Sequence, residues 1–352
     1  MKTMKKIIFM CFTALLIVAC SSDDDNTQSE YVPAAFAKGI LITNEGPFNN
    51  GSGTITYVSD DYSTVAQNIY RNVNGSALGN IVQSMGFNDD NAYIVVSNSQ
   101  KIVIANRYTF ESVDSITTGL DNPRYFVSVS GNKGYVSNWG DPNNNADDYV
   151  AVLDLRNNSI SATIPVSFGP ERILAANNKV YVAHQGGYGQ NNLISVISGN
   201  SVESTITVGD VPNSMVVSGN NLYVLCGGNP SYTGAETAGS LVKVDMATGQ
   251  VSQTFSFGST QHPSSLTLDG TNLFYNLDGK VYKVDTTSIS LPGADIIDGN
   301  FYTLQAKEGK LYAADAKDFA SKGSLVIYDL SNNQQIQDFQ TGIVPGGIYF
   351  NE

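Results

Sequence analysis

The sequence has 352 residues, of which 32 are acidic and 19 are basic, so its formal net charge is −13. Such an acidic chain is not expected to bind nucleic acids or anionic membranes, because polyanions attract basic surfaces. Two of the three cysteines, Cys11 and Cys20, lie in the N-terminal segment, which leaves Cys226 alone and predicts no disulfide in the folded part. We expect Cys226 to be a small buried strand residue.

The first 19 residues have the pattern of a targeting segment. Lysines at positions 2, 5 and 6 precede an apolar run over 7–18, which is too short to be a comfortable membrane span. The run ends Leu-Ile-Val-Ala before Cys20, and this resembles the lipobox of bacterial lipoproteins. We therefore expect a signal peptide over residues 1–19 and a lipid on Cys20, with the mature chain anchored through that lipid.

A polar segment over residues 20–35 follows the predicted lipid site. It starts Cys-Ser-Ser-Asp-Asp-Asp, and a Ser/Asp cluster at this place resembles the surface-export signal of Bacteroidetes lipoproteins. A solvated acidic tether is the alternative interpretation, and the two are compatible. The sequence thus predicts a lipidated tether over 20–35, a folded domain over 36–352, and a location at the outer membrane, exposed at the cell surface.

From residue 39 onward the chain consists of repeats of short strands. Runs rich in Val, Leu and Tyr are separated by Gly, Asn, Ser and Pro, which is typical of strands and turns. A Tyr-Val-type strand recurs every 40–50 residues or so, which with four strands per repeat indicates a β-propeller. The seven copies of this strand are anchored at Leu41, Val95, Tyr135, Tyr181, Tyr223, Phe274 and Tyr312. A proline precedes the opening strand of several copies: Pro123, Pro170, Pro212, Pro263 and Pro345.

The two ends of the repeat region complement each other. The last copy ends its outer strand near Phe339, yet a further opening strand follows over residues 343–350. The first copy lacks an opening strand of its own. We therefore predict an all-β, seven-bladed propeller in which the C-terminal strand pairs with the N-terminal blade and closes the ring.

Long loops are predicted to gather on one rim of the ring. In a four-stranded blade the link between the second and third strands shares a rim with the link from blade to blade, and most of the second-to-third links are long here. Loops on a rigid scaffold commonly carry binding groups, and aromatic faces with amides and arginines suit a large, partly apolar ligand. The predicted ligand-binding residues are Asn44, Phe48, Arg124, Asn138, Trp139, Arg172, His184, Tyr188, Asn213 and Tyr232.

Motifs of enzymes and metal sites are scarce. The chain has only two histidines, and we expect neither catalytic residues, a metal nor a catalytic cofactor. The loop 141–148 has oxygen ligands at alternate positions, as calcium loops do, but it lacks the expected glycine and glutamate, so a solvated loop is the favoured interpretation. A propeller enzyme would have to use Glu171, His184 and His262 near the channel mouth, and this remains an alternative.

The Tyr-Val-Ser-Asn and Tyr-Val-Ala-His strands, the proline-led opening strands and the third strands that end in Asp resemble the YVTN-repeat, or YncE-like, seven-bladed propellers. The resemblance covers nearly all of residues 39–352. With the lipobox and the acidic tether, the chain looks like a Bacteroidetes surface lipoprotein of the BtuG type. This resemblance implies capture of cobalamin and its transfer to a TonB-dependent outer-membrane transporter similar to BtuB. A siderophore, haem or a protein remains open as the ligand, as does a lactonase- or lyase-type enzyme or a scaffold.

Overall fold

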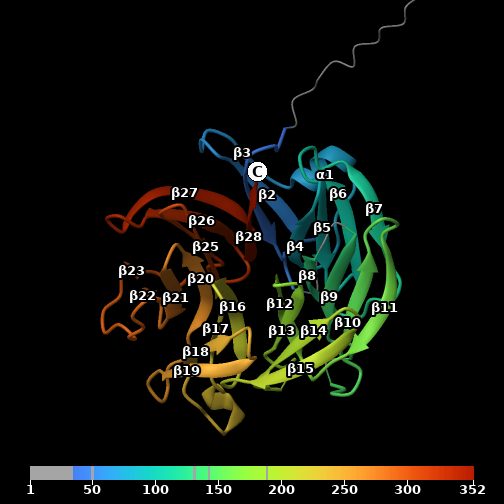
Figure 1. The fold of residues 1–352 in the computed structure, drawn as a ribbon. Coiled ribbons are helices and arrows are strands. Elements are labelled where there is room, and N and C mark those ends of the chain that lie inside the picture. The colour runs from blue at the N-terminus through green and yellow to red at the C-terminus, as the bar shows by residue number, and fades with distance from the viewer. Residues whose placement is uncertain (1–34, 49–50, 130–131, 142, 188) are drawn as a thin grey trace, which may run out of the picture. The chain divides into compact units, whose positions relative to one another are not determined.

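The computed structural model describes residues 35–48, 51–129, 132–141, 143–187 and 189–352, so the predicted signal peptide, Cys20 and Tyr188 lie outside the described residues. The described residues form seven antiparallel sheets of four strands each, arranged as blades around a common axis (Figure 1). This confirms the predicted all-β, seven-bladed propeller. The seven anchors of the repeat all lie in the second strand of their blade.

The strands are given for each blade from the axis outward. Blade 1 holds β28 (Pro345–Asn351), β1 (Gly39–Asn44), β2 (Thr54–Ser59) and β3 (Val65–Ala66). Blade 2 holds β4 (Val82–Asn88), β5 (Asn91–Val96), β6 (Lys101–Asn106) and β7 (Ser112–Ile116). Blade 3 holds β8 (Pro123–Ser128), β9 (Lys133–Asn138), β10 (Tyr149–Asp154) and β11 (Ser159–Pro165). Blade 4 holds β12 (Pro170–Ala176), β13 (Lys179–His184), β14 (Leu193–Ser198) and β15 (Ser201–Thr207).

The remaining three blades have the same order. Blade 5 holds β16 (Pro212–Ser218), β17 (Asn221–Cys226), β18 (Ser240–Asp245) and β19 (Gln250–Ser256). Blade 6 holds β20 (Ser264–Asp269), β21 (Asn272–Leu277), β22 (Lys280–Asp285) and β23 (Ile297–Asp298). Blade 7 holds β24 (Thr303–Lys307), β25 (Lys310–Asp315), β26 (Lys322–Asp329) and β27 (Gln334–Ile343).

Burial decreases from the inside of each blade to its outside. The second strands, such as β13 and β17, are buried at every position after their first residue, because each blade is covered by a neighbour on both faces. The outer strands, such as β19, are mostly exposed. The hydrophobic core consists of clusters packed between blades; Ile42 of blade 1, for example, packs in one cluster with Leu325 of blade 7. Cys226 is free and fully buried in β17, as expected.

Strand β28 closes the ring. It pairs antiparallel with β1, with Ile348 opposite Ile42, and it also contacts the opening strands β4 and β24 (Figure 1). The predicted pairing of the C-terminal strand with the N-terminal blade is therefore confirmed. The prediction placed Ile343 in the closing strand; that residue ends β27 instead, and only Val344 separates the two strands.

Two blades depart from the regular repeat at their outer edge. In blade 1, β3 has two residues and is followed by the short helix α1 (Ile69–Asn74), whose buried Ile69 and Tyr70 join the core beside β2. In blade 6, β23 also has two residues and follows the long segment 286–296. No helix of the described residues is long and apolar enough to cross a membrane.

Candidate functional site

The two rims of the ring differ in the length of their connections. One rim carries the second-to-third-strand loops and the blade-to-blade links, and these segments bond to one another: Gly53 N donates to Gly79 O at 2.8 Å, and Gly239 N to Gln261 O at 3.0 Å. We call it the loop rim. The opposite rim carries the short hairpins, with segment 286–296 as its long exception, and we call it the hairpin rim. The predicted division into an elaborated and a plain rim is thus present.

The backbone turns sharply where the chain passes from the loop rim into the opening strand of several blades. The residue just before the strand has a positive φ in several blades, including the β-branched Val211 (56°) and Val344 (54°), a conformation that costs energy for such residues. Directly after the proline the ladder is interrupted by a bulge, between Pro123 and Phe126 in β8 and between Pro170 and Ile173 in β12. Bulges redirect side chains, and here the residues released from regular pairing line the mouth of the channel.

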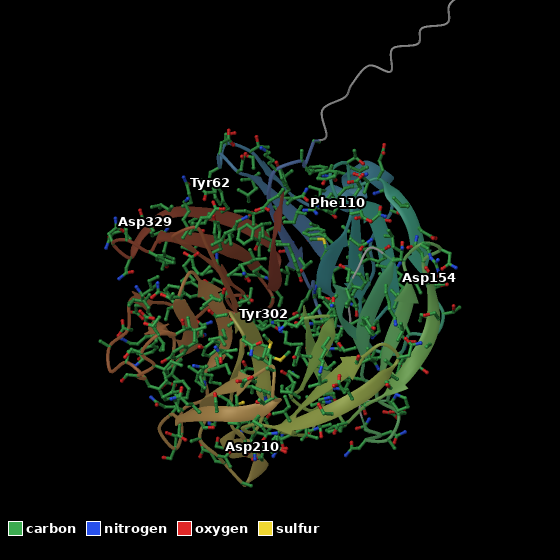
Figure 2. All side chains as sticks on the ribbon, in the orientation of Figure 1. Tyr62, Phe110, Asp154, Asp210, Tyr302 and Asp329 are labelled. Carbon is green, nitrogen blue, oxygen red and sulfur yellow. The ribbon has the colours of Figure 1, made fainter. Side chains whose placement is uncertain are left out.

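Two adjoining cavities follow the axis. The outer one, at the loop rim, has a volume of ≈ 180 Å³ and is mostly polar; its lining includes Glu45, Gln83, Arg124, Tyr125, Glu171, Arg172, Gln185, Asn213, Ser265 and Tyr302. The inner one has a volume of ≈ 400 Å³, and its lining mixes aliphatic side chains such as Leu174, Met215 and Leu266 with polar ones such as Thr267, Thr303 and Gln305. Tyr125, Arg172 and Ser265 line both cavities, so they lie where the mouth meets the inner channel. Figure 2 shows Tyr302 near the middle of the ring and Asp154 and Asp329 at its outer edge.

Arg124 and Glu171 form a bidentate ion pair across blades 3 and 4. Arg124 Nε donates to Glu171 Oε2 at 2.8 Å, and Nη2 donates to Oε1 at 2.9 Å. The guanidinium also lies 4.0 Å from the centre of the Trp139 ring, which is a cation–π contact. Glu171 is 4% exposed. Because the pair is bidentate and nearly buried, it fixes the wall of the mouth rather than leaving two free charges.

Arg172 lies at the base of the mouth without such a partner. Its guanidinium is 4.3 Å from the centre of the Tyr125 ring, and Gln83 Nε2 donates to the hydroxyl of that tyrosine at 3.4 Å. Among the described residues, Arg172 has no ion pair and no side-chain hydrogen bond; the ring of Tyr125 is its direct contact. Burial would lower the pKa of Arg172, but the Tyr125 hydroxyl and Glu171 outweigh it and keep the pKa raised. The side chain is therefore a permanent cation facing the two cavities.

Glu45 is the second carboxyl group of the mouth. The Tyr302 hydroxyl donates to Glu45 Oε1 at 3.1 Å. Burial raises the pKa of Glu45 above 4.5, an effect that the Tyr302 hydrogen bond and Arg124 only partly offset. Burial thus disfavours the ionised form of Glu45, while the charges of Arg124 and Arg172 favour it.

Exposed aromatic side chains lie on the loop rim in blades 1, 5 and 7. Phe48 in the β1–β2 loop is 72% exposed, and Tyr232 in the β17–β18 loop is 82% exposed. Phe319 in the β25–β26 loop packs edge-on against Tyr302 with ring centres 5.4 Å apart. Among the described residues, every large aromatic side chain that is exposed lies on the loop rim, whereas the exposed large aliphatic residues lie on outer strands and α1. Exposed aromatic faces of this kind are what a broad ligand face would contact.

The structure brings together three of the predicted binding residues in the mouth: Arg124, Arg172 and Asn213. Asn213 Nδ2 donates to Pro263 O at 2.9 Å, so its amide also holds the next link in place. Trp139 lies behind Arg124 rather than in the cavity lining, and its indole N–H is buried without a hydrogen-bond partner. Phe48 and Tyr232 lie at the tips of rim loops, outside the mouth itself.

Asn44, Asn138 and His184 were expected to face a ligand, but their polar atoms are used within the protein. Each is fully buried at the end of a second strand, opposite the residue that opens the first strand. Asn44 Oδ1 accepts from Gly342 N at 2.9 Å, and Asn138 Oδ1 accepts from Asp121 N at 3.2 Å. His184 Nε2 lies 2.8 Å from Ser195 Oγ, and burial lowers the pKa of His184 to about 4. His184 Nδ1 also lies 3.3 Å from Phe168 O, so Asn138 and His184 hold blade-to-blade links and Asn44 holds the end of β27. All three lie outside the cavity lining.

Sequence reasoning missed Gln83, Tyr125, Tyr302 and Glu45 as residues of the mouth. Tyr125 could have been found from its register, because it occupies in blade 3 the second position after the proline that Arg172 occupies in blade 4. Tyr302 and Gln83 belong to blades whose opening strand lacks the proline, so no landmark marked them. Glu45 follows a second strand, and its approach to Tyr302 joins segments 257 residues apart.

The described residues do not assemble a metal site or a histidine-based catalytic group at the mouth. No cluster of three or more His, Cys, Asp and Glu side chains suited to a metal ion occurs among them. In the 141–148 loop, Asp148 Oδ1 accepts from Gly169 N at 2.9 Å, so this carboxylate serves the fold. His262 Nδ1 lies 2.8 Å from Gly227 O and its Nε2 lies 3.1 Å from Glu236. Of the three groups that a propeller enzyme was expected to use, only Glu171 lines the mouth.

These features define a seven-bladed β-propeller with an elaborated rim around a polar axial mouth. By sequence, the chain belongs to the family described as a domain of unknown function, DUF5074, whose model matches residues 38–292. A search of curated proteins found no match.

Solved structures with the same fold are distant in sequence. A functionally unknown protein from Desulfotomaculum acetoxidans DSM 771 is 12% identical with a TM-score of 0.65, covering 89% of this chain and 98% of its own. The periplasmic gluconolactonase PpgL of Pseudomonas aeruginosa is 13% identical with a TM-score of 0.63 and the same two coverages, 89% and 98%. BamB from Moraxella catarrhalis is 16% identical with a TM-score of 0.54, covering 91% of this chain and 90% of its own. At such identities the likeness concerns the fold alone.

Proposed function

We propose that this protein captures a large, cofactor-like nutrient on its loop rim, by binding without chemical turnover. The observation that carries the proposal is that the exposed aromatic side chains, including Phe48 and Tyr232, share the loop rim with a mouth lined by arginine, amide and hydroxyl groups. Exposed aromatic rings supply apolar contact at little conformational cost, and the polar mouth supplies hydrogen bonds and charge.

The favoured ligand is cobalamin or a related corrinoid, in line with the resemblance to BtuG-type propellers. The outer cavity, with a volume of ≈ 180 Å³, is too small to enclose a macrocycle. Such a ligand would therefore lie across the rim, with its broad face on the aromatic side chains and one peripheral group in the mouth. The acidic surface of the chain agrees with a small-molecule ligand better than with a polyanion.

The experiment is a titration of cobalamin into the folded protein and two variants. Tyr232→Ala removes an exposed rim aromatic, and Val113→Ala removes an exposed hydrophobic side chain from the outer strand β7, far from the loop rim. We expect Tyr232→Ala to weaken binding by about ten-fold or more, or about 1.4 kcal/mol, and Val113→Ala to leave it unchanged. If the wild type does not bind cobalamin, the assignment of cobalamin as the ligand is refuted. If both variants lose affinity equally, the placing of the binding site on the loop rim is refuted.

The cellular setting is part of the same proposal. A lipid on Cys20 and the acidic tether would hold the propeller at the outer surface, where it would pass its ligand to a TonB-dependent, BtuB-like transporter. The lipobox and the Ser-Ser-Asp-Asp-Asp segment of the sequence support this. We expect a Cys20→Ala protein to lose membrane fractionation and lipid labelling. Retention of that variant in the outer membrane would contradict anchoring through a lipid on Cys20. If the wild-type protein does not co-purify with any transporter after cross-linking, the proposed transfer to a transporter is contradicted.

A further inference from the structure

We infer that Arg172 anchors an anion-binding subsite at the base of the mouth, and that this subsite takes a singly charged oxyanion of the ligand, a carboxylate or a phosphodiester. The inference rests on the proposed function, namely that the loop rim binds a ligand. It adds that this ligand carries a singly charged anionic group, which the rim aromatics alone do not require. It can be tested with small anions, independently of which nutrient the protein binds.

The first step is that Arg172 has a charge without a counter-ion. Its guanidinium stacks on Tyr125 at 4.3 Å and forms no ion pair with the described residues, in a chain that has 32 acidic residues. Burial alone would disfavour this charge; the surrounding tyrosines and Glu171 offset that effect, but no carboxylate forms an ion pair with the guanidinium. A charged group that lines a cavity without an ion-pair partner is a candidate ligand-binding group.

The second step is that the nearby carboxylates are committed elsewhere. Both oxygens of Glu171 accept from Arg124, at 2.8 and 2.9 Å. Glu45 accepts from the Tyr302 hydroxyl at 3.1 Å; the charge of Arg172 helps to lower its pKa, but Glu45 forms no ion pair or hydrogen bond with Arg172. Arg124 is thus neutralised by an ion pair, while Arg172 is the free cation of the mouth and offers its guanidinium donors to whatever enters.

The third step is the shape of the place that Arg172 occupies. Arg172, Tyr125 and Ser265 line both the polar mouth and the inner channel, so an anion reaching Arg172 would lie within the ring, between several blades. Ser265 Oγ accepts from Leu304 N at 2.7 Å, which leaves its own proton free to donate. The guanidinium fork matches the two oxygens of a carboxylate or a phosphodiester, and the Ser265 hydroxyl lines the same two cavities. A dianion would require a second free cation, which the lining of the mouth does not supply.

The direct test follows the arginine Nε–Hε signals of labelled protein by NMR during titration with dimethyl phosphate and, separately, with acetate. We expect the Arg172 signal, assigned by its loss in Arg172→Gln, to shift saturably with at least one of the two anions. The neutral trimethyl phosphate should not shift it. No saturable shift with either anion, or an equal shift with trimethyl phosphate, would overturn the subsite.

Matched variants separate the subsite from general charge effects. Arg156→Gln removes a cation from a hairpin-rim loop, where Arg156 pairs with Asp154, and should leave anion affinity unchanged. Arg172→Lys keeps the charge but loses the fork of donors, and should weaken anion affinity by about ten-fold or more. Equal losses for Arg156→Gln and Arg172→Lys would overturn the inference, because the effect would then be long-range attraction.

A third arm distinguishes failure of the subsite from failure of the proposed function. Cobalamin contains one phosphodiester, and cobinamide lacks it, so wild type should bind cobalamin more tightly while Arg172→Gln should bind both alike. If cobalamin binds equally well to wild type and Arg172→Gln, the subsite is refuted and nutrient capture stands. If dimethyl phosphate or acetate binds at Arg172 but cobalamin does not bind at all, the subsite stands and the corrinoid assignment fails.

Discussion

Arg124 and Glu171 occupy the same position in neighbouring blades, the first residue after the opening proline, and their side chains meet through two hydrogen bonds of 2.8 and 2.9 Å across the channel mouth. The bulge that follows each proline releases these residues from the regular ladder. A repeat that carried the same side chain in both blades would set like charges against each other. Here, divergence between two copies of one repeat creates an ion pair, and the next position in the same strands supplies Tyr125 and Arg172.

Removing Arg124 should destabilise the protein more than removing Arg172. Arg124→Gln leaves Glu171, which is 4% exposed, without its counter-ion, and we expect a loss of about 3 kcal/mol in the free energy of unfolding. Arg172→Gln removes a charge that has no partner and should leave stability unchanged or slightly higher. Urea unfolding of both variants checks this. Equal destabilisation would mean that Arg172 has a structural role like that of Arg124.

Deleting residues 345–352 should prevent formation of a stable ring. The deletion removes β28, which exposes one edge of β1 and removes the contacts of β28 with β4 and β24. We expect aggregation or loss of the cooperative melting transition, measured by light scattering and circular dichroism. A chain that lacks only Glu352, which follows β28, is the control and should melt like the wild type. A cooperative melt of the longer deletion at the wild-type temperature would contradict closure by this strand.

Replacing Asp148 should stabilise the protein above neutral pH. Burial raises the pKa of Asp148 to about 6, although Gly169 N donates to this carboxylate, and Oδ2 has no hydrogen-bond partner. Because the folded protein holds this proton more tightly than the unfolded chain, stability is lost as pH rises from about 3.8 through about 6.

An Asp148→Asn variant keeps an oxygen acceptor and avoids the buried charge. We expect the variant to melt at a higher temperature than wild type at pH 7.5, with a gain in the free energy of unfolding of no more than about 3 kcal/mol. The two proteins should melt at the same temperature below about pH 4. The measurement is a series of melting curves across this range for both proteins. A constant difference at every pH would assign the effect to packing and not to titration.

His184 should have the opposite pH dependence. Burial lowers the pKa of His184 to about 4, so the unfolded chain binds a proton between about pH 6.5 and pH 4 that the folded protein does not. Its contribution to stability is complete above pH 6.5 and is lost as the pH falls. A His184→Gln variant should be less stable than wild type at pH 7.5, with a gap that narrows on acidification by up to about 3 kcal/mol. A gap that widens at pH 5 would contradict the neutral, buried imidazole.

The ring could be predicted from the sequence because its signals are local. Tyr-Val-type pairs anchor the second strands, prolines mark five of the seven opening strands, and periodicity implies the stacking of the blades. The two-residue strands β3 and β23 were not foreseen, because outer strands are mostly exposed and their sequences are weakly constrained.

The site was predicted only in part, for a physical reason. The alternation of residues along a strand predicts which face a side chain lies on. It does not predict which blade-to-blade link will form hydrogen bonds with that side chain. Arg124, Arg172 and Asn213 follow the opening prolines and do reach the mouth. Asn44, Asn138 and His184 lie at strand ends near the same rim, yet each bonds to a segment that leaves the neighbouring blade. Those bonds depend on contacts between blades, which no single repeat contains.

The pairing of β28 with β1 also sets the order of events during synthesis. Strand β1 must wait for a partner that is made about 300 residues later, which at ribosomal rates of about 5–20 residues per second is some tens of seconds. During this interval blades 2 to 6 can form from their own consecutive strands, while blade 1 stays incomplete with an open edge. The ring therefore becomes a closed unit only in one late step, and every nascent chain passes through a stage in which β1 needs protection from the β-edges of other molecules.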